Sequence, residues 1–114
     1  MDPIKLENIR CQKCDDFYLL RDSMKGLFLA ASQFPKNRET RAPLLCEIKD
    51  VISELPEKYK HFADAPTEDL EGDRLVVRFN RKGNTHYLSA EKDNKKKKYF
   101  FVYEEGSWKE KKRD

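Results

Sequence analysis

The sequence is poor in cysteine and glycine and has no long apolar run. It contains 3 cysteines and 4 glycines among 114 residues, and an odd number of cysteines does not make a disulfide framework. No apolar stretch approaches the roughly 18 residues that a membrane span needs, and the first residues lack the apolar segment of a signal peptide. A glycine-rich phosphate loop and a Ser/His/Asp or Cys/His set at usable spacing are also missing. We therefore expect a non-catalytic, cytoplasmic chain with no membrane partner.

Charged and aromatic residues are abundant instead. Asp, Glu, Lys and Arg make up 39% of the chain, and 7 Phe, 5 Tyr and 1 Trp argue against disorder because so much aromatic surface requires burial or a ligand. The net charge of +3 conceals a segregation of charge along the chain. The net charge is −1 over residues 1–20, +3 over 21–41, −6 over 42–73 and +7 over 74–114. Two interpretations stay open. The blocks arise by chance on a solvated surface, or the two basic segments face a polyanion while the acidic segment turns away.

Hydrophobic spacing predicts short strands on both sides of one amphipathic helix. Apolar residues recur at helical spacing from Leu44 to Leu55, and we expect Pro56 to end this helix or to force a restart. Cys46 lies off the apolar stripe and is interpreted as a free thiol without a role. We predict strands at residues 17–20, 27–31, 75–79, 86–90 and 99–103 and a short strand at Trp108, an acidic linker at 63–73, a lysine run between strands at 95–98, and a frayed basic tail at 109–113.

The two β segments share a sequence pattern. Residues 19–21 (Leu-Leu-Arg) and 76–78 (Val-Val-Arg) are each followed by Lys-Gly, with the glycine five residues after the arginine. Residues 28–31 (Phe-Leu-Ala-Ala) then match residues 87–90 (Tyr-Leu-Ser-Ala), with two extra residues after the second glycine. The pattern predicts two copies of one small β unit, each with its own basic stretch.

Cys11 and Cys14 form a Cys-x2-Cys knuckle of the kind that binds tetrahedral zinc, but a closed site needs four ligands. Together with the run Arg-x-Ser-x-Lys-Gly-x-Phe at 21–28 and the block 28–44, the knuckle resembles the C-terminal zinc ribbons of bacterial DNA topoisomerase I, a family of type IA enzymes. The likeness continues through residues 55–58, 63–66 and 77–82.

The sequence departs from that family at the metal site. Ala31 and Asn37 stand where the family has its second pair of cysteines. Alanine offers no ligand, asparagine is a poor one for zinc beside thiolates, and His61 and His86 are not at knuckle spacing from another ligand. We therefore expect no bound zinc or other cofactor in this chain, with Cys11 and Cys14 as remnants of a lost site.

The resemblance implies a small, mostly β fold with one main α-helix, built from two zinc-ribbon-like (rubredoxin-like) antiparallel units that lack zinc. We place the first unit at residues 1–41, the helix and acidic linker at 42–73, and the second unit with its basic tail at 74–114.

The resemblance also implies a function. It predicts a non-catalytic region that binds single-stranded DNA and assists strand capture and passage during the ATP-independent relaxation of negatively supercoiled DNA. In that family the catalytic tyrosine and the acidic Mg²⁺ site lie in a separate core, and neither motif is present here. The expected setting is a monomeric, nucleoid-associated bacterial topoisomerase, with the rest of that chain as a partner. The alternative is a protein-interaction module that docks the topoisomerase to RNA polymerase.

Single-stranded DNA requires cations along its phosphates and flat aromatic surfaces under its bases. Strand alternation puts Val77 and Phe79 on one apolar face, so we expect Phe79 to lean towards the core. Tyr87 shares its face with Ser89 and is therefore the better candidate for exposure. A single aromatic residue is more often part of the core than a base platform. A lysine run is usually a solvated loop, except between the strands of a DNA-binding unit. We expect phosphate contacts from Arg21, Lys25, Lys36, Arg38, Arg41, Arg78, Arg81 and Lys82, and base stacking from some of Phe28, Phe34, Tyr87, Tyr99 and Trp108, with Phe79 less favoured.

Overall fold

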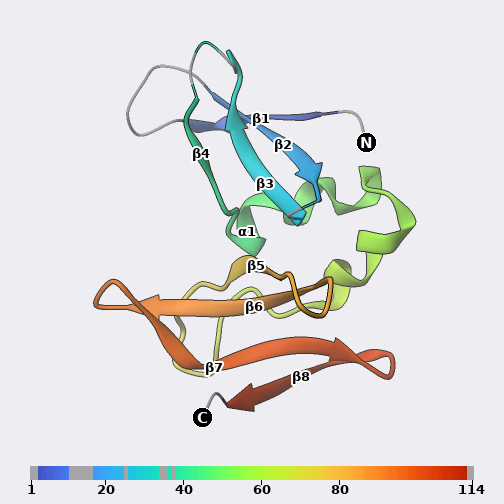
Figure 1. Cartoon of the computed structure of the whole chain (residues 1–114), viewed down its shortest axis with the longest axis vertical. Helices are drawn as coiled ribbons and strands as arrows, with labels where there is room; N and C mark the ends of the chain where they lie inside the picture. Colours follow the sequence, from blue (N-terminus) through green and yellow to red (C-terminus); the bar gives the residue numbers. More distant parts are fainter. Residues whose placement is uncertain (1–2, 11–16, 25, 34–35, 37, 113–114) are drawn as a thin grey trace.

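A computed structural model describes residues 3–10, 17–24, 26–33, 36 and 38–112 (Figure 1). It contains two four-stranded antiparallel sheets in which strands adjacent in the chain are adjacent in the sheet, and helical segments lie between the sheets and along one side (Figure 1). The mostly β fold is therefore confirmed. The elements are β1 (Ile4–Arg10), β2 (Phe17–Ser23), β3 (Gly26–Ala31) and β4 (Thr40–Arg41) in the first sheet, then α1 (Leu45–Ile48), η1 (Lys49–Glu54) and η2 (Glu57–Asp64), and β5 (Val76–Asn80), β6 (Thr85–Lys92), β7 (Lys95–Glu104) and β8 (Ser107–Lys112) in the second sheet.

The strands are longer and more numerous than predicted. Two strands, β1 and β4, flank the predicted hairpin of the first sheet and were not predicted. The predicted position of the lysine run between strands is wrong, because this run opens β7. The reason lies in the turn before it, where Asp93 and Asn94 both adopt positive φ and complete a two-residue hairpin turn. The prediction of a frayed basic tail is wrong up to Lys112, because these residues belong to the edge strand β8.

The helix forms on the predicted stripe but is mostly a 3-10 helix. Only Leu45–Ile48 is α-helical, and η1 continues it to Glu54. A second 3-10 segment, η2, begins directly after Pro56, so the predicted restart at this proline is confirmed. The Lys49 ammonium ties the two segments together because it donates hydrogen bonds to three carbonyl groups at the end of η2 and just beyond it, those of Phe62, Ala63 and Ala65, at 3.3, 2.9 and 3.0 Å. Within the described residues, no helix is long and apolar enough to cross a membrane.

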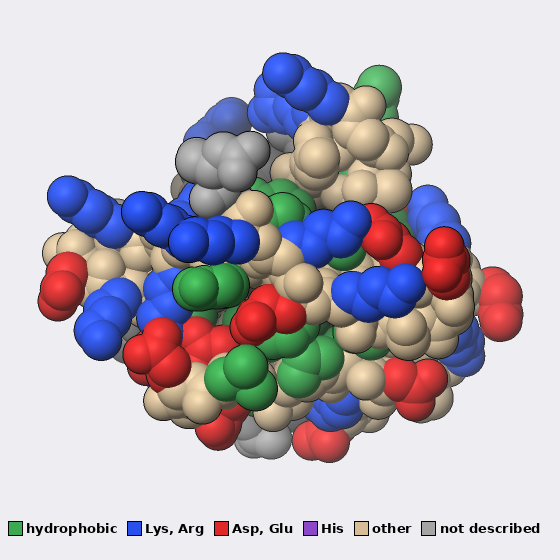
Figure 2. All heavy atoms as spheres, turned by 90° about the horizontal axis from the view of Figure 1, so that it is seen from below, with side chains coloured by type: hydrophobic (Ala, Val, Ile, Leu, Met, Phe, Trp, Pro, Cys, Tyr) green, Lys and Arg blue, Asp and Glu red, His purple; other side chains and the backbone are tan. Residues whose placement is uncertain are grey.

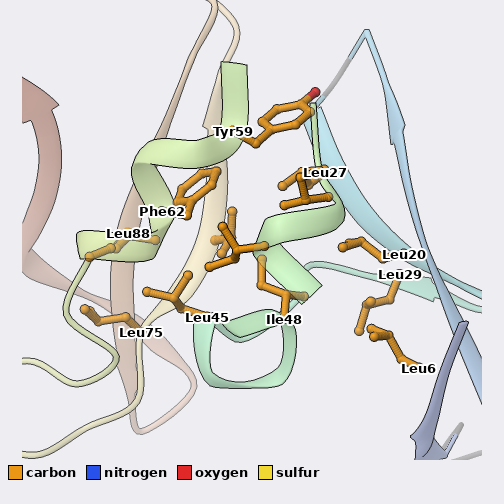
Figure 3. Packing of buried hydrophobic residues seen from close by; sticks show 14 of the residues in the cluster. Leu6, Leu20, Leu27, Leu29, Leu45, Ile48, Tyr59, Phe62, Leu75 and Leu88 are labelled. Atoms are coloured by element: carbon orange, nitrogen blue, oxygen red, sulfur yellow. The ribbon is translucent and has the colours of Figure 1, made fainter. Parts of the chain in front are cut away.

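Both sheets contribute to one hydrophobic core. A single cluster of buried side chains runs from Leu6 and Leu20 in the first sheet, through Ile48 and Phe62 in the helical segments, to Leu88 in the second (Figure 3). The backbone also joins the two halves, because residues 43–45 exchange hydrogen bonds with residues 75–77. The two sheets therefore share one core.

The two hairpins have the same register. Arg21 lies opposite Phe28 in the β2–β3 pair, and Arg78 lies opposite Tyr87 in the β5–β6 pair. Residues directly opposite each other in a sheet point to the same face. Each hairpin therefore sets an arginine beside an aromatic ring on the face that is turned away from the helical segments, while Leu20 with Leu29 and Val77 with Leu88 occupy the core face.

The tip of the first hairpin is locked onto the second sheet. The backbone amide of Leu27 donates a hydrogen bond of 3.1 Å to Nε2 of His86. Gly26 has a φ of +89° and lies so close that a Cβ atom there would be 2.6 Å from His86 Nε2 and 2.8 Å from the Phe79 ring. A side chain at position 26 is therefore excluded both by space and by backbone conformation. Burial, followed by the charges of His61 and Lys58, lowers the pKa of His86 to about 4, so the imidazole is neutral and accepts the bond at pH 7.

Candidate nucleic-acid interface

A groove runs between the two sheets and is lined by predicted site residues from both. It encloses about 500 Å³, and six of the fourteen side chains expected to contact DNA line it. They come from β3, β4, β5, the β5–β6 turn and β6, so residues about 60 positions apart in the chain meet in one place. These six are Phe28, Arg41, Arg78, Phe79, Arg81 and Tyr87.

The groove continues over the outer face of the second sheet. A neighbouring hollow of about 410 Å³ shares Phe79, Arg81 and Tyr87 with the groove and adds Lys82 and Phe100 to the lining. The rings of Tyr87 and Phe100 meet edge to face, with their centroids 5.9 Å apart and the planes at 76°. Both side chains are only partly buried. The result is an aromatic surface with cations at its border, which is the combination that unstacked bases and their phosphates require.

Phe100 is a candidate that the sequence analysis missed. Phe100 lies opposite Ser89, which shares its face of β6 with Tyr87, while the adjacent Phe101 lies opposite Leu88 on the core face. Strand alternation in the run Tyr-Phe-Phe-Val at 99–102 gives two possible faces. The choice between them depends on a register shift between Ser89 and Glu91, for which the sequence holds no signal.

Phe79 lies at the junction of the sheets and does not lie flat in the groove. It packs edge to face on His86, with ring centroids 5.0 Å apart and an interplanar angle of 68°. This arrangement fits the expectation that Phe79 leans towards the core. Its exposed edge still lines the groove.

Two of the three arginines in the groove lining are held by carboxylates. Arg41 forms a two-pronged ion pair with Glu47, at 2.8 and 2.6 Å, and its guanidinium also lies 5.0 Å from the centre of the Tyr18 ring. Arg78 pairs with Glu91 and donates a hydrogen bond of 3.1 Å from Nε to the Ser89 hydroxyl. Both guanidinium groups are therefore fixed in direction before any ligand arrives.

Other predicted cations lie outside this groove lining. Arg21 is partly exposed on β2, beside Phe28 on the same face of the first sheet. Lys36 and Arg38 are exposed in the connection between β3 and β4. The expectations for Lys25 and Phe34 lie outside the described residues.

Two predicted stacking residues lie away from the groove. Trp108 packs against Phe62, with ring centroids 5.7 Å apart, and its indole nitrogen donates a hydrogen bond of 2.9 Å to the His61 carbonyl. Tyr99 is 47% exposed but lines a different hollow, beside Asp69 and Glu71. Sequence alone does not separate these rings from Tyr87, because each of the three lies within a few residues of Lys or Arg.

The acidic linker forms ion pairs with the second sheet. Lys97, whose side chain is 10% exposed, forms ion pairs with Asp69 and Glu71 at 2.8 and 3.1 Å and with Asp73. The hydrogen bonds that the Lys97 ammonium donates to Asp69 and Asp73 raise the pKa of Lys97. Part of the charge segregation seen in the sequence is thus internal pairing. Figure 2 accordingly shows a mixed surface, on which Lys and Arg prevail towards the upper and left side, with acidic side chains among and below them.

The comparisons with known proteins agree with the resemblance seen in the sequence. Residues 5–41 match the sequence model of the topoisomerase I zinc-ribbon-like family. The chain is 49% identical over 109 residues to the DNA topoisomerase 1 of Pseudomonas aeruginosa, 47% identical over 107 residues to that of Escherichia coli and 45% identical over 107 residues to that of Vibrio cholerae. Residues 5–41 belong to the topoisomerase I zinc-ribbon-like family. The matches cover 96%, 94% and 94% of this chain but only 13%, 12% and 12% of the three relatives, so they correspond to a small part of a larger topoisomerase.

Membership of this family raises the question of a metal. Within the described residues, no group of three His, Cys, Asp or Glu side chains is placed to hold a metal ion. Ala31, at one of the family's cysteine positions, is fully buried in β3, and Cys46 is exposed on α1. His86 already accepts the Leu27 amide with Nε2. The expectations for Cys11, Cys14 and Asn37 lie outside the described residues, so the expected absence of zinc stays a prediction.

Proposed function

We propose that this chain binds single-stranded DNA in the groove between its sheets and over the outer face of the second sheet. The observation that carries the proposal is the groove itself. Two rings on separate sheets, Phe28 and Tyr87, and three arginines meet there although their sequence segments lie far apart. Stacking on rings and contact with phosphates do not depend on the base, so the binding is tolerant of sequence.

The role that follows belongs to a larger enzyme. The relatives are DNA topoisomerases about eight times longer than the matched segment, and the chain lacks the motifs for cleavage. We propose that it lies in the C-terminal part of a type IA topoisomerase, in a bacterial cell, and holds the strand that is passed during relaxation of negative supercoils. The shared register of the two hairpins supports the further proposal that they are copies of one β unit, each supplying one arginine and one ring.

The alternative, docking to RNA polymerase through the acidic segment, has less support. Asp69, Glu71 and Asp73 are engaged by Lys97 within the chain. A partner that used these carboxylates would have to displace this lysine. The observations therefore favour nucleic acid over a protein partner.

A matched pair of tyrosine variants tests the proposal. We expect the wild-type chain to bind a fluorescent oligothymidylate, with an affinity that falls steeply as the salt concentration rises. Tyr87→Ala should weaken binding by about 5- to 100-fold, because the stacking of one base on a ring contributes roughly 1–3 kcal/mol. Tyr99→Ala, which removes a more exposed ring outside the groove, should change the affinity less than twofold. Equal losses in the two variants, or no binding by the wild type at low salt, would contradict the proposal.

A further inference from the structure

A second pocket, which is rich in arginine, shares part of its lining with the groove. This pocket encloses about 520 Å³ and shares Arg41 and Arg78 with the groove. Its other charged side chains are Glu47, Arg74 and Glu91, so its lining carries three positive and two negative charges. Arg74 was not among the residues expected from the sequence to contact DNA.

Two of the three arginines are already neutralised by carboxylates. Glu47 accepts both prongs of Arg41 and also the backbone amide of Leu44, at 2.8 Å. Burial alone acts to raise the pKa of Glu47, but these hydrogen bonds and the charges of Arg41 and Arg74 leave it below its ordinary value. The Arg41–Glu47 pair is therefore fully ionised and cancels its own charge at neutral pH.

The second pair is more open to exchange. Glu91, the partner of Arg78, is 50% exposed, whereas the Arg78 side chain is only 17% exposed and is also held by the Ser89 hydroxyl. An exposed carboxylate gains little from such a pair because water solvates it well. A ligand anion can therefore take the place of Glu91 while Arg78 stays where it is.

Arg74 is the cation that remains. Its guanidinium makes no hydrogen bond or ion pair with any other residue among those described, although its backbone is fixed by a bridge to Glu68. Its positive charge helps to lower the pKa of Glu47, which lines the same pocket. The lining thus has a net charge of +1 and presents one unused guanidinium beside two oriented ones.

We propose that the arginine pocket, formed by Arg41, Arg74 and Arg78, binds one phosphate of the DNA strand that lies in the groove. A phosphodiester carries one negative charge, which matches the charge of the lining, and guanidinium groups bind phosphate oxygens with paired hydrogen bonds. The inference rests on the proposed function and deepens it. The DNA bases stack on the rings of the groove. One phosphate of the same strand binds in the arginine pocket, where it competes with Glu91 for Arg78.

Two variants with opposite expected effects test the arginine pocket. Arg74→Gln should weaken oligothymidylate binding by about five- to tenfold at low salt. It should also reduce the slope of log affinity against log salt by about 0.7, the value for one fewer phosphate neutralised on a single strand. Glu91→Gln removes the competing carboxylate and should tighten binding severalfold. The matched control is Lys112→Gln, which removes an exposed cation that lies near Tyr99 and outside the pocket.

The outcomes separate the two proposals. If Arg74→Gln and Lys112→Gln weaken binding equally, and Glu91→Gln gives no gain while wild-type binding is intact, the phosphate site is wrong and the proposed function stands. If the wild type itself does not bind the oligonucleotide at low salt, the proposed function is wrong and the phosphate site falls with it. Thermal unfolding of each variant checks that a loss of affinity does not arise from a loss of fold.

Discussion

Each sheet contains a hairpin of the same register, but the two sheets present different surfaces. Each sets an arginine beside a ring, Arg21 with Phe28 and Arg78 with Tyr87. The strand beyond the hairpin differs, because β4 has 2 residues while β7 has 10. The second sheet therefore extends its ring into a broad face that includes Phe100, whereas the first sheet supplies only one wall of the groove. The strand next to each hairpin therefore determines how large a surface its arginine and ring can join.

The largest effect is expected from separating the sheets at the tip of the first hairpin. Gly26→Ala places a Cβ atom against His86 and Phe79 and forces alanine into a positive φ. We expect the free energy of unfolding to fall by about 3 kcal/mol or more, since the contact and the backbone are strained together. Urea unfolding followed by tryptophan fluorescence measures it.

Gly106→Ala is the matched control for that variant. Gly106 has a φ of +83°, but a Cβ atom there would meet nothing within 4 Å. The loss should therefore be limited to the backbone cost, about 1 kcal/mol. If the two variants lose the same stability, the contact between the first hairpin and the second sheet does not hold the halves together.

Acid should weaken the same contact by a smaller amount. The pKa of His86 is about 4 in the folded chain and near 6.5 when unfolded. Because the folded pKa is the lower one, the unfolded state takes up a proton first, and stability is lost as pH falls from about 6.5 towards 4. Between pH 7.5 and 5 we expect a loss of about 2 kcal/mol.

The pH effect has its own control. His86→Gln removes the titrating group, so the slope of stability against pH should become shallower over this interval. His61, whose pKa is also lowered by burial, contributes in the same direction and remains in the variant. An unchanged slope in His86→Gln would show that the contact between the sheets does not depend on a neutral imidazole at position 86.

A weaker effect is expected from the loss of the ion pairs between the second sheet and the acidic linker. Lys97→Gln removes the partner of Asp69, Glu71 and Asp73. The melting temperature should fall, by less than in Gly26→Ala, and the difference from wild type should shrink in high salt because screening weakens the same ion pairs in the wild type. Lys92→Gln, an exposed lysine in the same sheet, provides the comparison and should leave the melting temperature unchanged.

No effect is expected from treatment that would remove a bound metal ion. The first sheet belongs to a zinc-ribbon-like family, while its core is formed by apolar residues such as Leu20 and Leu29 that are fully buried. Treatment with a strong chelator should therefore leave the unfolding curve unchanged. Unfolding of the first sheet on chelation would show that Cys11 and Cys14 hold a structural metal after all.

Much of the fold was accessible from the sequence because its signals are local. The hairpin around Gly26, the apolar stripe from Leu44 to Leu55 and the restart at Pro56 each follow from spacing within a few residues. The strand β4, by contrast, consists of two polar residues that are strand only because β3 lies beside them. No local pattern marks such a strand.

The candidate site was accessible in part for the same reason. Arg78 and Tyr87 could be placed on an outward face from alternation alone, and the structure brings them to the groove. Trp108 and Tyr99 carry similar neighbours in the sequence, but long-range contacts with Phe62 and with the acidic linker decide their surroundings. Arg74 follows the linker without any motif and becomes notable only beside Glu47, 27 positions earlier.

The most direct test of the account is to map a short oligothymidylate onto the folded chain by NMR. The groove predicts saturable shifts at Phe28 in the first sheet and at Arg81, Tyr87 and Phe100 in the second, with the same affinity at each. Trp108 and Lys97 should stay unchanged. Shifts confined to one sheet, or centred on Tyr99 and Trp108, would contradict the claim that both sheets form one binding surface.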